Sequence, residues 1–262
     1  EIAVLLRWEQ LHWGCKRIAD VLRRMKLKIS RTSVQRMLRR NPRKPAVKET
    51  KPKTRRADIQ AKREHHVWLV DLTHVVSFMG LLRVRVVAIM DAYTRAIVAT
   101  GVSTSEPSAD WMCAFVAKAM KQSGAKPAHL ISDRGSQFTA TRFQAMLRRR
   151  GIRHRFGAVG THGSISLIER FWRSMKTECL DATCVWLSAR TVARNVADYS
   201  DWYNRSRPHQ GLGGRTPREA AAKTQRGKPI EIKAGDVVRV SRRDLHDDPK
   251  LPVYTLCVKK SA

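Results

Sequence analysis

The chain has 262 residues, with 52 Lys and Arg against 22 Asp and Glu, and its formal net charge is +30 at pH 7. A charge of this size destabilises a compact protein by self-repulsion unless a polyanion neutralises it, so nucleic acid is the expected partner. Hydrophobic residues make up 42% of the chain and include seven Trp, which predicts folded cores and excludes a disordered packaging polycation.

The cysteines and the apolar segments narrow the class further. Five Cys show no paired CxxC spacing, so the sequence predicts neither a disulfide framework nor a cysteine-rich zinc site. No apolar run approaches the roughly 18 residues needed to span a bilayer, and the N-terminus lacks a secretory pattern. We therefore expect a soluble, cytoplasmic protein. The start at Glu1, without an initiator Met, is compatible with a missing upstream segment.

Residues 1–41 are predicted to form three short helices in a helix-turn-helix arrangement. Apolar residues of the second helix, Ile18 to Met25, recur at helical spacing. Ser30 is expected to cap the third helix, which would bury Val34, Met37 and Leu38. A purely structural basic bundle would show the same periodicity and stays an alternative. The outer face of the third helix carries the residues that we expect to bind DNA: Arg31, Gln35, Arg36, Arg39 and Arg40.

Residues 42–64 are predicted to form a basic linker that is rich in Pro, Lys, Arg and Thr and almost free of large apolar side chains. Residues 1–63 hold 20 Lys and Arg against five acidic residues. This arm is expected to follow DNA phosphates and to bind in a salt-dependent way. A solvated spacer without DNA contacts is the alternative.

Residues 65–222 are predicted to form the folded core. It begins with an apolar run at 67–73, a turn at 78–80, a strand of β-branched residues at 81–89 and a third strand at 91–99. Three consecutive strands joined by short turns form an antiparallel meander.

The next segments alternate between helices and strands. A helix that Ser108 opens and Gly124 closes is followed by a strand at 129–132, a helix around 143–147 and a strand at 152–156. The order βββαβαβα predicts a mixed five-stranded sheet with helices on both faces, which is the α/β arrangement of the ribonuclease H fold.

A Gly-rich stretch at 157–164, GAVGTHGS, is expected to be a mobile loop, and Ser164 is expected to cap the next helix. On one face of that helix stand Glu169, Arg173 and Lys176, at spacings of i, i+4 and i+7. The neighbouring face is predicted to be buried, through Ile165, Ile168, Trp172 and Met175.

The C-terminal third has less pattern. A helix is predicted at 188–204, followed by the segment YNRSRPHQGLGGRTPREA. Residues 223–262 are basic and show apolar alternation at 229–232, 236–240 and 253–258. This pattern predicts a small β module or a loosely held tail.

Three acidic residues are candidates for one catalytic site. Asp71 lies inside an apolar run, Asp133 ends a strand, and Glu169 follows Asp133 after 35 intervening residues. Carboxylate oxygens suit Mg²⁺, and two divalent ions are a common device for phosphodiester chemistry. Each acid also has a structural interpretation. Asp133 could open a turn and Glu169 could pair with Arg173, whereas burial of Asp71 would be costly without a partner. A fourth acid, Asp91, is interpreted as a turn residue.

Four features together resemble the DDE transposases of bacterial insertion sequences and the retroviral integrases. These are WLVDLT at 68–73, LISDRGSQF at 130–138, the 35-residue interval to Glu169 with Lys176 seven residues beyond, and the closing segment YNRSRPHQGLGGRTPREA. The resemblance covers residues 65 to about 222. The loop GTHGSISLIE departs from the Asp-Asn-Ala type that is common in related transposases.

The resemblance implies a mechanism. Asp71, Asp133 and Glu169 would be the catalytic metal ligands for Mg²⁺ or Mn²⁺, two ions in the active complex, and no zinc is expected. The protein would cut transposon ends and join the freed 3′ hydroxyl to target DNA without a covalent protein–DNA intermediate. Lys176 would contact terminal phosphates, and Gln137, with Arg173, would contact DNA near the site. The family also implies a homo-oligomer on double-stranded DNA, associated with the bacterial nucleoid.

Two other functions remain open from the sequence. A ribonuclease H-like nuclease would hydrolyse DNA without strand transfer, and the basic arm and the closing segment argue against it. A DNA-binding regulator derived from a transposase would keep the helix-turn-helix and lack catalysis. Intact acids at all three positions argue against that alternative.

Overall fold

A computed structural model describes residues 2–9, 13–40, 60–76, 83–157, 166–180, 188–223 and 237–259. The chain forms two compact units, one of residues 1–50 and 202–262 and the other of residues 51–201. Several predicted features lie outside the described residues: most of the linker, the turn at 78–80, nearly all of the Gly-rich loop with its Ser164 cap, and the alternation at 229–232. The four-part division at residues 41, 64 and 222 stays a prediction.

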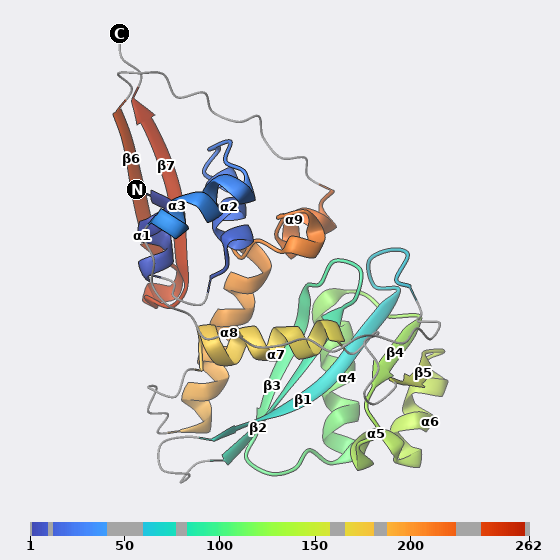
Figure 1. The fold of residues 1–262 in the computed structure, drawn as a ribbon. Coiled ribbons are helices and arrows are strands. Elements are labelled where there is room, and N and C mark those ends of the chain that lie inside the picture. Colours follow the sequence, from blue (N-terminus) through green and yellow to red (C-terminus); the bar gives the residue numbers. More distant parts are fainter. Residues whose placement is uncertain are drawn as a thin grey trace. The chain divides into compact units, whose positions relative to one another are not determined.

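The unit of residues 51–201 is built on a five-stranded mixed sheet (Figure 1). Its strand order is β3-β2-β1-β4-β5, with β1 pairing antiparallel to β2 and parallel to β4. The antiparallel meander and the ribonuclease H-like sheet of the sequence analysis are confirmed. The strands are β1 (Val67–Val76), β2 (Arg83–Asp91), β3 (Ile97–Ser103), β4 (His129–Ser132) and β5 (Arg153–Phe156).

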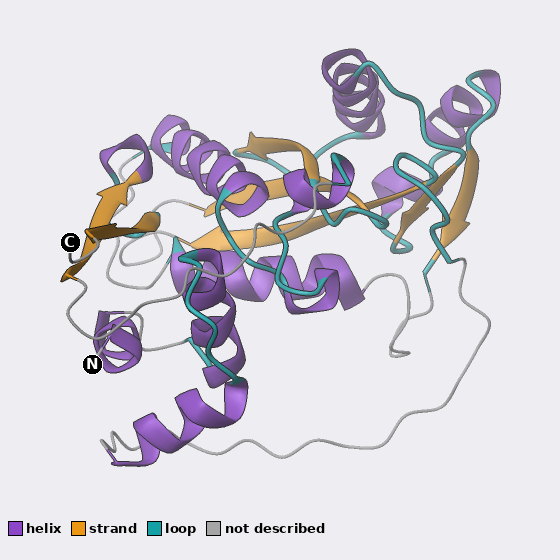
Figure 2. Cartoon of the chain, turned by 90° about the horizontal axis from the view of Figure 1, so that it is seen from above, coloured by secondary structure: helices purple, strands orange, loops and turns teal. Residues whose placement is uncertain are grey.

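Helices cover both faces of this sheet (Figures 1 and 2). The helices α4 (Ala109–Ser123) and α6 (Thr141–Arg149) share one face, where the apolar core joins them to Trp68, Val70 and Leu130. The opposite face carries α7 (Ser166–Glu178), which contacts β1. Successive side chains of a strand point to opposite faces, so Asp71 must point away from α4 and α6 and towards α7.

Local chemistry explains where the elements begin and end. The Ser108 hydroxyl accepts a hydrogen bond from the backbone N–H of Trp111 at 3.2 Å, which caps α4, and Gly124 ends that helix with a φ of 63°. One predicted strand boundary was wrong. The third strand begins at Ile97 rather than at Asp91, because Asp91 ends β2 and its carboxylate holds the following turn.

The predicted helix around 143–147 is present as α6, but a short helix that precedes it, directly after Gly135, was not predicted. The short α5 (Ser136–Thr139) is separated from α6 by Ala140, whose φ of −55° and ψ of 132° are extended. The single residue redirects the chain, and Phe138 and Phe143 pack edge to face on either side of it, with ring centroids 5.6 Å apart.

The other unit contains the three predicted N-terminal helices, α1 (Ile2–Glu9), α2 (Cys15–Arg24) and α3 (Arg31–Arg40). Ile18, Leu22 and Val34 are fully buried, and Ser30 caps α3 by accepting from the Ser33 N–H at 3.0 Å. The predicted burial of Met37 was wrong, because that side chain is 38% exposed. Periodicity alone placed Met37 on the inner face, and α3 buries a narrower stripe than the periodicity predicts.

Residues 202–259 add to this unit. Helix α8 (Ala189–Arg205) ends in it, and the closing segment folds into a short 3-10 helix, η2 (Gln210–Leu212), and α9 (Pro217–Ala221). Thr216 and Glu219 form a capping box for α9, and Glu219 pairs with Arg24 of α2 at 2.6 Å. The strands β6 (Val237–Asp244) and β7 (Pro252–Lys259) pair antiparallel, and the Trp202 indole donates to the Pro252 carbonyl at 3.0 Å. Within the described part of the chain, no helix is long and apolar enough to cross a membrane.

Because α4 packs closely on β3, we expect a larger residue at Gly101 to lower the stability of the protein. A Cβ added there would lie 2.8 Å from the Trp111 ring and 3.0 Å from the Phe115 ring. We expect Gly101→Ala to destabilise the protein by about 1 to 3 kcal/mol, because the stacked rings must shift. Urea denaturation would measure this. A loss below about 0.5 kcal/mol, the usual range for a substitution at an unconstrained surface position, would contradict the packing argument.

Candidate active site

Asp71 lies in the middle of β1, the central strand of the sheet, and faces α7. Its carboxylate accepts a hydrogen bond from the Trp172 indole N–H at 2.9 Å. Trp172 is a buried residue of α7, one turn after Glu169. This hydrogen bond therefore connects the central strand directly to the helix that carries the third candidate acid.

Asp133 follows β4, which runs parallel to β1 with Leu69 opposite Ile131. Continuing this register along the two strands aligns Asp133 with Asp71. The Asp133 carboxylate accepts from the backbone N–H of Gly135 at 3.0 Å. Asp133 thus makes the turn contact of its structural interpretation and also lies beside Asp71 at the end of β4.

Glu169 lies in the first turn of α7 and is exposed. Its helix is anchored by the burial of Ile168, Phe171, Trp172 and Met175, so the face with Glu169 points outward. Arg173 and Lys176 are exposed on the same side of α7. The described ion pairs include none between Glu169 and Arg173, the structural alternative for Glu169.

The three acids interact electrostatically. The pKa of Asp71 is raised from 3.8 to about 6, mainly by burial and also by the negative charges of Asp133 and Glu169, while the hydrogen bonds from Trp172 and the Leu72 backbone oppose the rise. Asp133 and Glu169 are both close enough to act on the same carboxylate. Two neighbouring anions and a half-buried third form a site of concentrated negative charge in a chain with a net charge of +30.

The acids are not gathered into a closed metal site. Among the described residues, no three His, Cys, Asp or Glu side chains are grouped closely enough to hold a metal ion. Each acid is held apart from the others by its own surroundings. Trp172 donates to Asp71, the Gly135 N–H donates to Asp133, and Glu169 is exposed to solvent. The donor chemistry nevertheless fits a hard divalent cation, since all the ligand atoms would be carboxylate oxygens and their mutual repulsion would be relieved.

The other predicted residues have distinct environments. Gln137 is buried, with an exposed fraction of 6%, and its side chain lies against Gly135 in the turn after Asp133. Asp91 is fully buried and accepts hydrogen bonds from the backbone N–H and hydroxyl of Thr94, at 3.0 and 2.6 Å, and from the His65 N–H. Asp91 is therefore a turn residue, as the sequence predicted.

The predicted DNA-binding residues of α3 lie in the other unit. Arg31, Arg36 and Arg39 are exposed and Gln35 is half-buried. They lie on the polar side of α3, and Val34 is buried on the opposite face. Their exposure leaves them accessible to a ligand, and their role in binding DNA stays a prediction.

Two contacts near the acids were not predicted from the sequence. Trp172 was predicted to be only a buried core residue, yet its indole N–H needs an acceptor when buried and finds Asp71. The second contact is between Ser132 and His154, whose Oγ and Nε2 lie 2.9 Å apart beneath Asp133. A Trp one helical turn after a candidate acid could have indicated the first contact. No sequence pattern predicts the contact between Ser132 and His154.

Comparison with known proteins identifies related sequences. Two family models, both described as integrase core domains, match residues 61–162 and 150–217. A candidate transposase for insertion sequence element IS986/IS6110 of Mycobacterium tuberculosis is 29% identical over 239 residues, covering 83% of this chain and 84% of that protein. The transposase InsF for insertion sequence IS3A of Escherichia coli is 27% identical over 234 residues, covering 83% of this chain and 79% of that protein.

A solved structure shares the fold. A chain in the cryoEM structure of the simian T-cell lymphotropic virus intasome in complex with PP2A regulatory subunit B56 gamma matches with a TM-score of 0.53. The sequences are 17% identical, and the match covers 92% of this chain and 82% of that chain.

The raised pKa of Asp71 makes a prediction about stability. Above pH 6 the carboxylate is ionised in both the folded and the unfolded state, and the folded state bears the whole cost of burial. As the pH falls from about 6 towards 4, the folded state takes up the proton first and the cost disappears. Without divalent cations, Asp71→Asn should therefore stabilise the protein by about 1 to 3 kcal/mol at pH 7.5.

The same difference should shrink to about 0.5 kcal/mol at pH 4 and vanish below about pH 3, because only below its ordinary pKa of 3.8 is Asp71 neutral in the unfolded as well as in the folded state. Urea denaturation of both proteins across this pH range measures the effect. A difference that stays constant between pH 7.5 and 4 would contradict the assignment of a raised pKa to Asp71.

Proposed function

The chain belongs to the DDE transposases of the retroviral integrase superfamily, and from this premise we propose that it moves an insertion sequence by two-metal strand transfer. As a polynucleotidyl transferase, it acts in DNA transposition. The finer steps of our proposal are cleavage of phosphodiesters at the transposon ends and joining of the freed 3′ hydroxyl to target DNA. The observation that carries the proposal is that Asp133 and Glu169 both lie close enough to Asp71 for their negative charges to help raise its pKa.

These three carboxylates would hold the metal ions, Mg²⁺ or Mn²⁺. When bound, two divalent ions activate the attacking oxygen and stabilise the departing 3′ oxygen. Asp71 and Asp133 come from adjacent parallel strands and provide a fixed part of the site. Glu169, on the exposed face of α7, would complete it when DNA and metal neutralise the repulsion among the acids.

Other residues of the core would position the reactants. Trp172 donates a hydrogen bond to one oxygen of Asp71 and so fixes the orientation of the carboxylate that would bind a cation. Lys176 lies seven residues after Glu169 on the same exposed face, where it would bind a terminal phosphate. Arg173 lies between them and would extend this contact, and Gln137 would support the turn that holds Asp133.

We propose further that the N-terminal helices bind the transposon ends. Arg31, Gln35, Arg36 and Arg39 would face the DNA, and residues 42–64 would follow its phosphates. Because two ends must be joined together, the working form would be a homo-oligomer on double-stranded DNA. The site of action would be the bacterial cytoplasm, on the nucleoid.

A strand-transfer assay with labelled end DNA, target DNA and Mg²⁺ tests the proposed chemistry. We expect Asp133→Asn to reduce joined product by more than about a hundredfold, because the metal contribution is worth several kcal/mol. Chelation of Mg²⁺ should have the same effect, and binding of end DNA should persist in both cases. Asp110→Asn is the matched control, since it removes an exposed carboxylate that pairs with Arg142 on the surface.

The assay also separates the alternatives. Joined product from the unaltered protein supports the transposase, and cleavage without joining would instead identify a nuclease. Binding without either reaction would identify a regulator. Undiminished joining by Asp133→Asn would overturn the assignment of the site.

Lys176 makes a separate prediction about DNA affinity. Lys176→Ala should weaken binding of transposon-end DNA about fivefold at low salt and reduce the salt dependence by about one counterion, because one phosphate contact is lost. Arg170→Ala is the control, since Arg170 is also exposed on α7 but lies about 100° around the helix from Glu169. Fluorescence anisotropy would measure the affinity of both variants for DNA. Equal losses of affinity would show that only the net charge matters and would contradict a specific phosphate contact at Lys176.

A further inference from the structure

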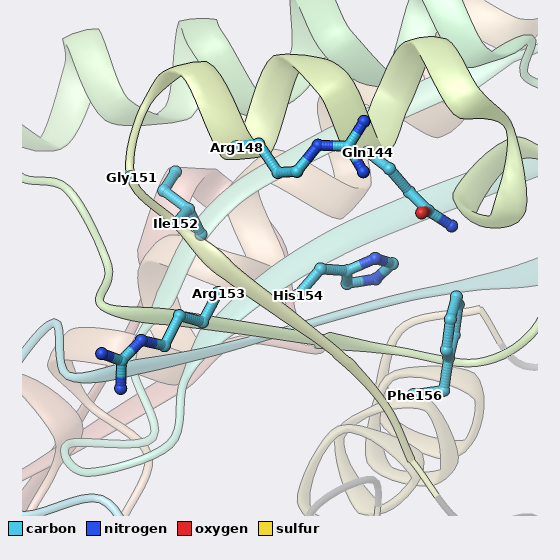
Figure 3. A pocket seen from close by; sticks show the side chains of 7 residues that line it. All are labelled: Gln144, Arg148, Gly151, Ile152, Arg153, His154 and Phe156. Atoms are coloured by element: carbon cyan, nitrogen blue, oxygen red, sulfur yellow. The ribbon is translucent and has the colours of Figure 1, made fainter.

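A cavity of about 520 Å³ lies between α6 and β5, on the face of the sheet away from Asp71 and Trp172. It is formed entirely within the unit of residues 51–201. The side chains of Gln144 and Arg148 extend from α6 towards His154 and Phe156 of β5, whereas Arg153 is turned away from them (Figure 3). None of the three candidate catalytic acids lines this cavity.

The cavity is suited to an anionic ligand. Its lining contains Arg148 and Arg153 and no acidic residue, and the neighbouring Arg149, Arg150 and Arg155 are exposed. No ion pair to Arg148 occurs among the residues that the structure describes. A guanidinium group at the mouth of a cavity can bind a phosphate with two parallel hydrogen bonds.

Hydrogen bonding inside the cavity specifies a second feature of the ligand. Ser132 donates its only hydroxyl hydrogen to the Asp133 carbonyl at 2.7 Å, so towards His154 it must accept. His154 Nε2 therefore carries a hydrogen. Burial lowers the pKa of His154, which favours the neutral ring, and Nδ1 of a neutral ring with Nε2–H is an acceptor. A matching ligand presents an N–H or O–H donor to His154.

The shape and the apolar part of the lining complete the description. Ile152 and the rings of His154 and Phe156 provide apolar surface, and the Arg134 guanidinium lies 5.4 Å from the centre of the Phe156 ring. The volume is in the range of small-molecule sites and holds a single base with its phosphate. A DNA duplex is about 20 Å wide and cannot enter a space between one helix and one strand, so the base must be unpaired.

We propose that the cavity between α6 and β5 binds one unpaired nucleotide of a DNA strand, with its phosphate on Arg148 and a base N–H donated to His154 Nδ1. The inference rests on the proposed function, because it takes the ligand from the DNA that the protein processes. The cavity lies close to the candidate active site through two contacts. Ser132 links His154 to the Asp133 backbone, and Arg134, the residue after Asp133, covers Phe156. These contacts connect the lining of the cavity to the turn that carries Asp133.

The test compares two DNA probes on the full-length protein. One is a blunt duplex, and the other is the same duplex with a single unpaired fluorescent purine analogue at its end. We expect tighter binding of the second probe, by about tenfold, with a change in fluorescence as the base leaves water. Arg148→Ala should remove most of this preference. Arg149→Ala should leave it intact, because Arg149 carries the same charge on the same helix but does not line the cavity.

The outcomes separate the inference from the proposed function. Binding of both probes with equal affinity, or an equal loss of preference in Arg148→Ala and Arg149→Ala, would overturn the cavity as a nucleotide site while leaving the transposase proposal intact. Absence of binding to any DNA would overturn both. His154→Gln, which keeps an acceptor in the cavity, should retain more of the preference than His154→Leu, and the reverse order would also overturn the inference.

Discussion

The hydrogen bond between Trp172 and Asp71 connects the two halves of the candidate active site. Asp71 is placed by the central strand, whose buried neighbours fix its position, and Trp172 is placed by the apolar face of α7. Burial of an ionised carboxylate is costly unless hydrogen bonds or a cation compensate, and the indole N–H compensates only in part, since the pKa of Asp71 remains raised to about 6. The orientation of α7, and with it the exposure of Glu169 and Lys176, follows from this packing.

The distribution of charge in the chain is suited to a site where a metal ion and DNA meet. The chain has a net charge of +30, yet its central strand carries an acid that is influenced by two others. Basic residues attract a phosphate backbone over the whole surface, and the acids would repel the same phosphates unless divalent cations lie between them. An acidic site inside a basic protein therefore suits a reaction that brings metal and DNA together. The proposed ligand of the cavity between α6 and β5 also matches its charges. The arginines of the cavity suit a phosphate, and its uncharged interior suits a base.

Much of this fold could be predicted from residue patterns because it depends on local chemistry. The strand His129–Ser132, the Ser108 cap and the Gly124 end of α4 were predicted correctly from a short apolar run and from capping residues. The errors arose where a single side chain or backbone angle overrides the pattern. The turn that Asp91 holds delays the third strand to Ile97, the extended backbone of Ala140 separates α6 from a short helix that was not predicted, and Met37 is 38% exposed despite its helical spacing. At the candidate site, the positions of the acids were accessible to sequence reasoning. The pairing of Asp71 with Trp172, and of Ser132 with His154, depends on tertiary packing that no local pattern encodes.

We propose that Asp71, Asp133 and Glu169 together bind a divalent cation, and the claim is tested most directly by the pKa of the Asp71 carboxyl, measured by NMR titration with and without Mg²⁺. We expect a pKa of about 6 without the ion, as burial and the two neighbouring charges require. At saturating Mg²⁺ we expect a value well below that, because a cation favours the ionised carboxylate. Loss of the Mg²⁺ effect in Asp133→Asn would place the ion between the two acids. A pKa of Asp71 that does not respond to Mg²⁺ in the unaltered protein would contradict the claim.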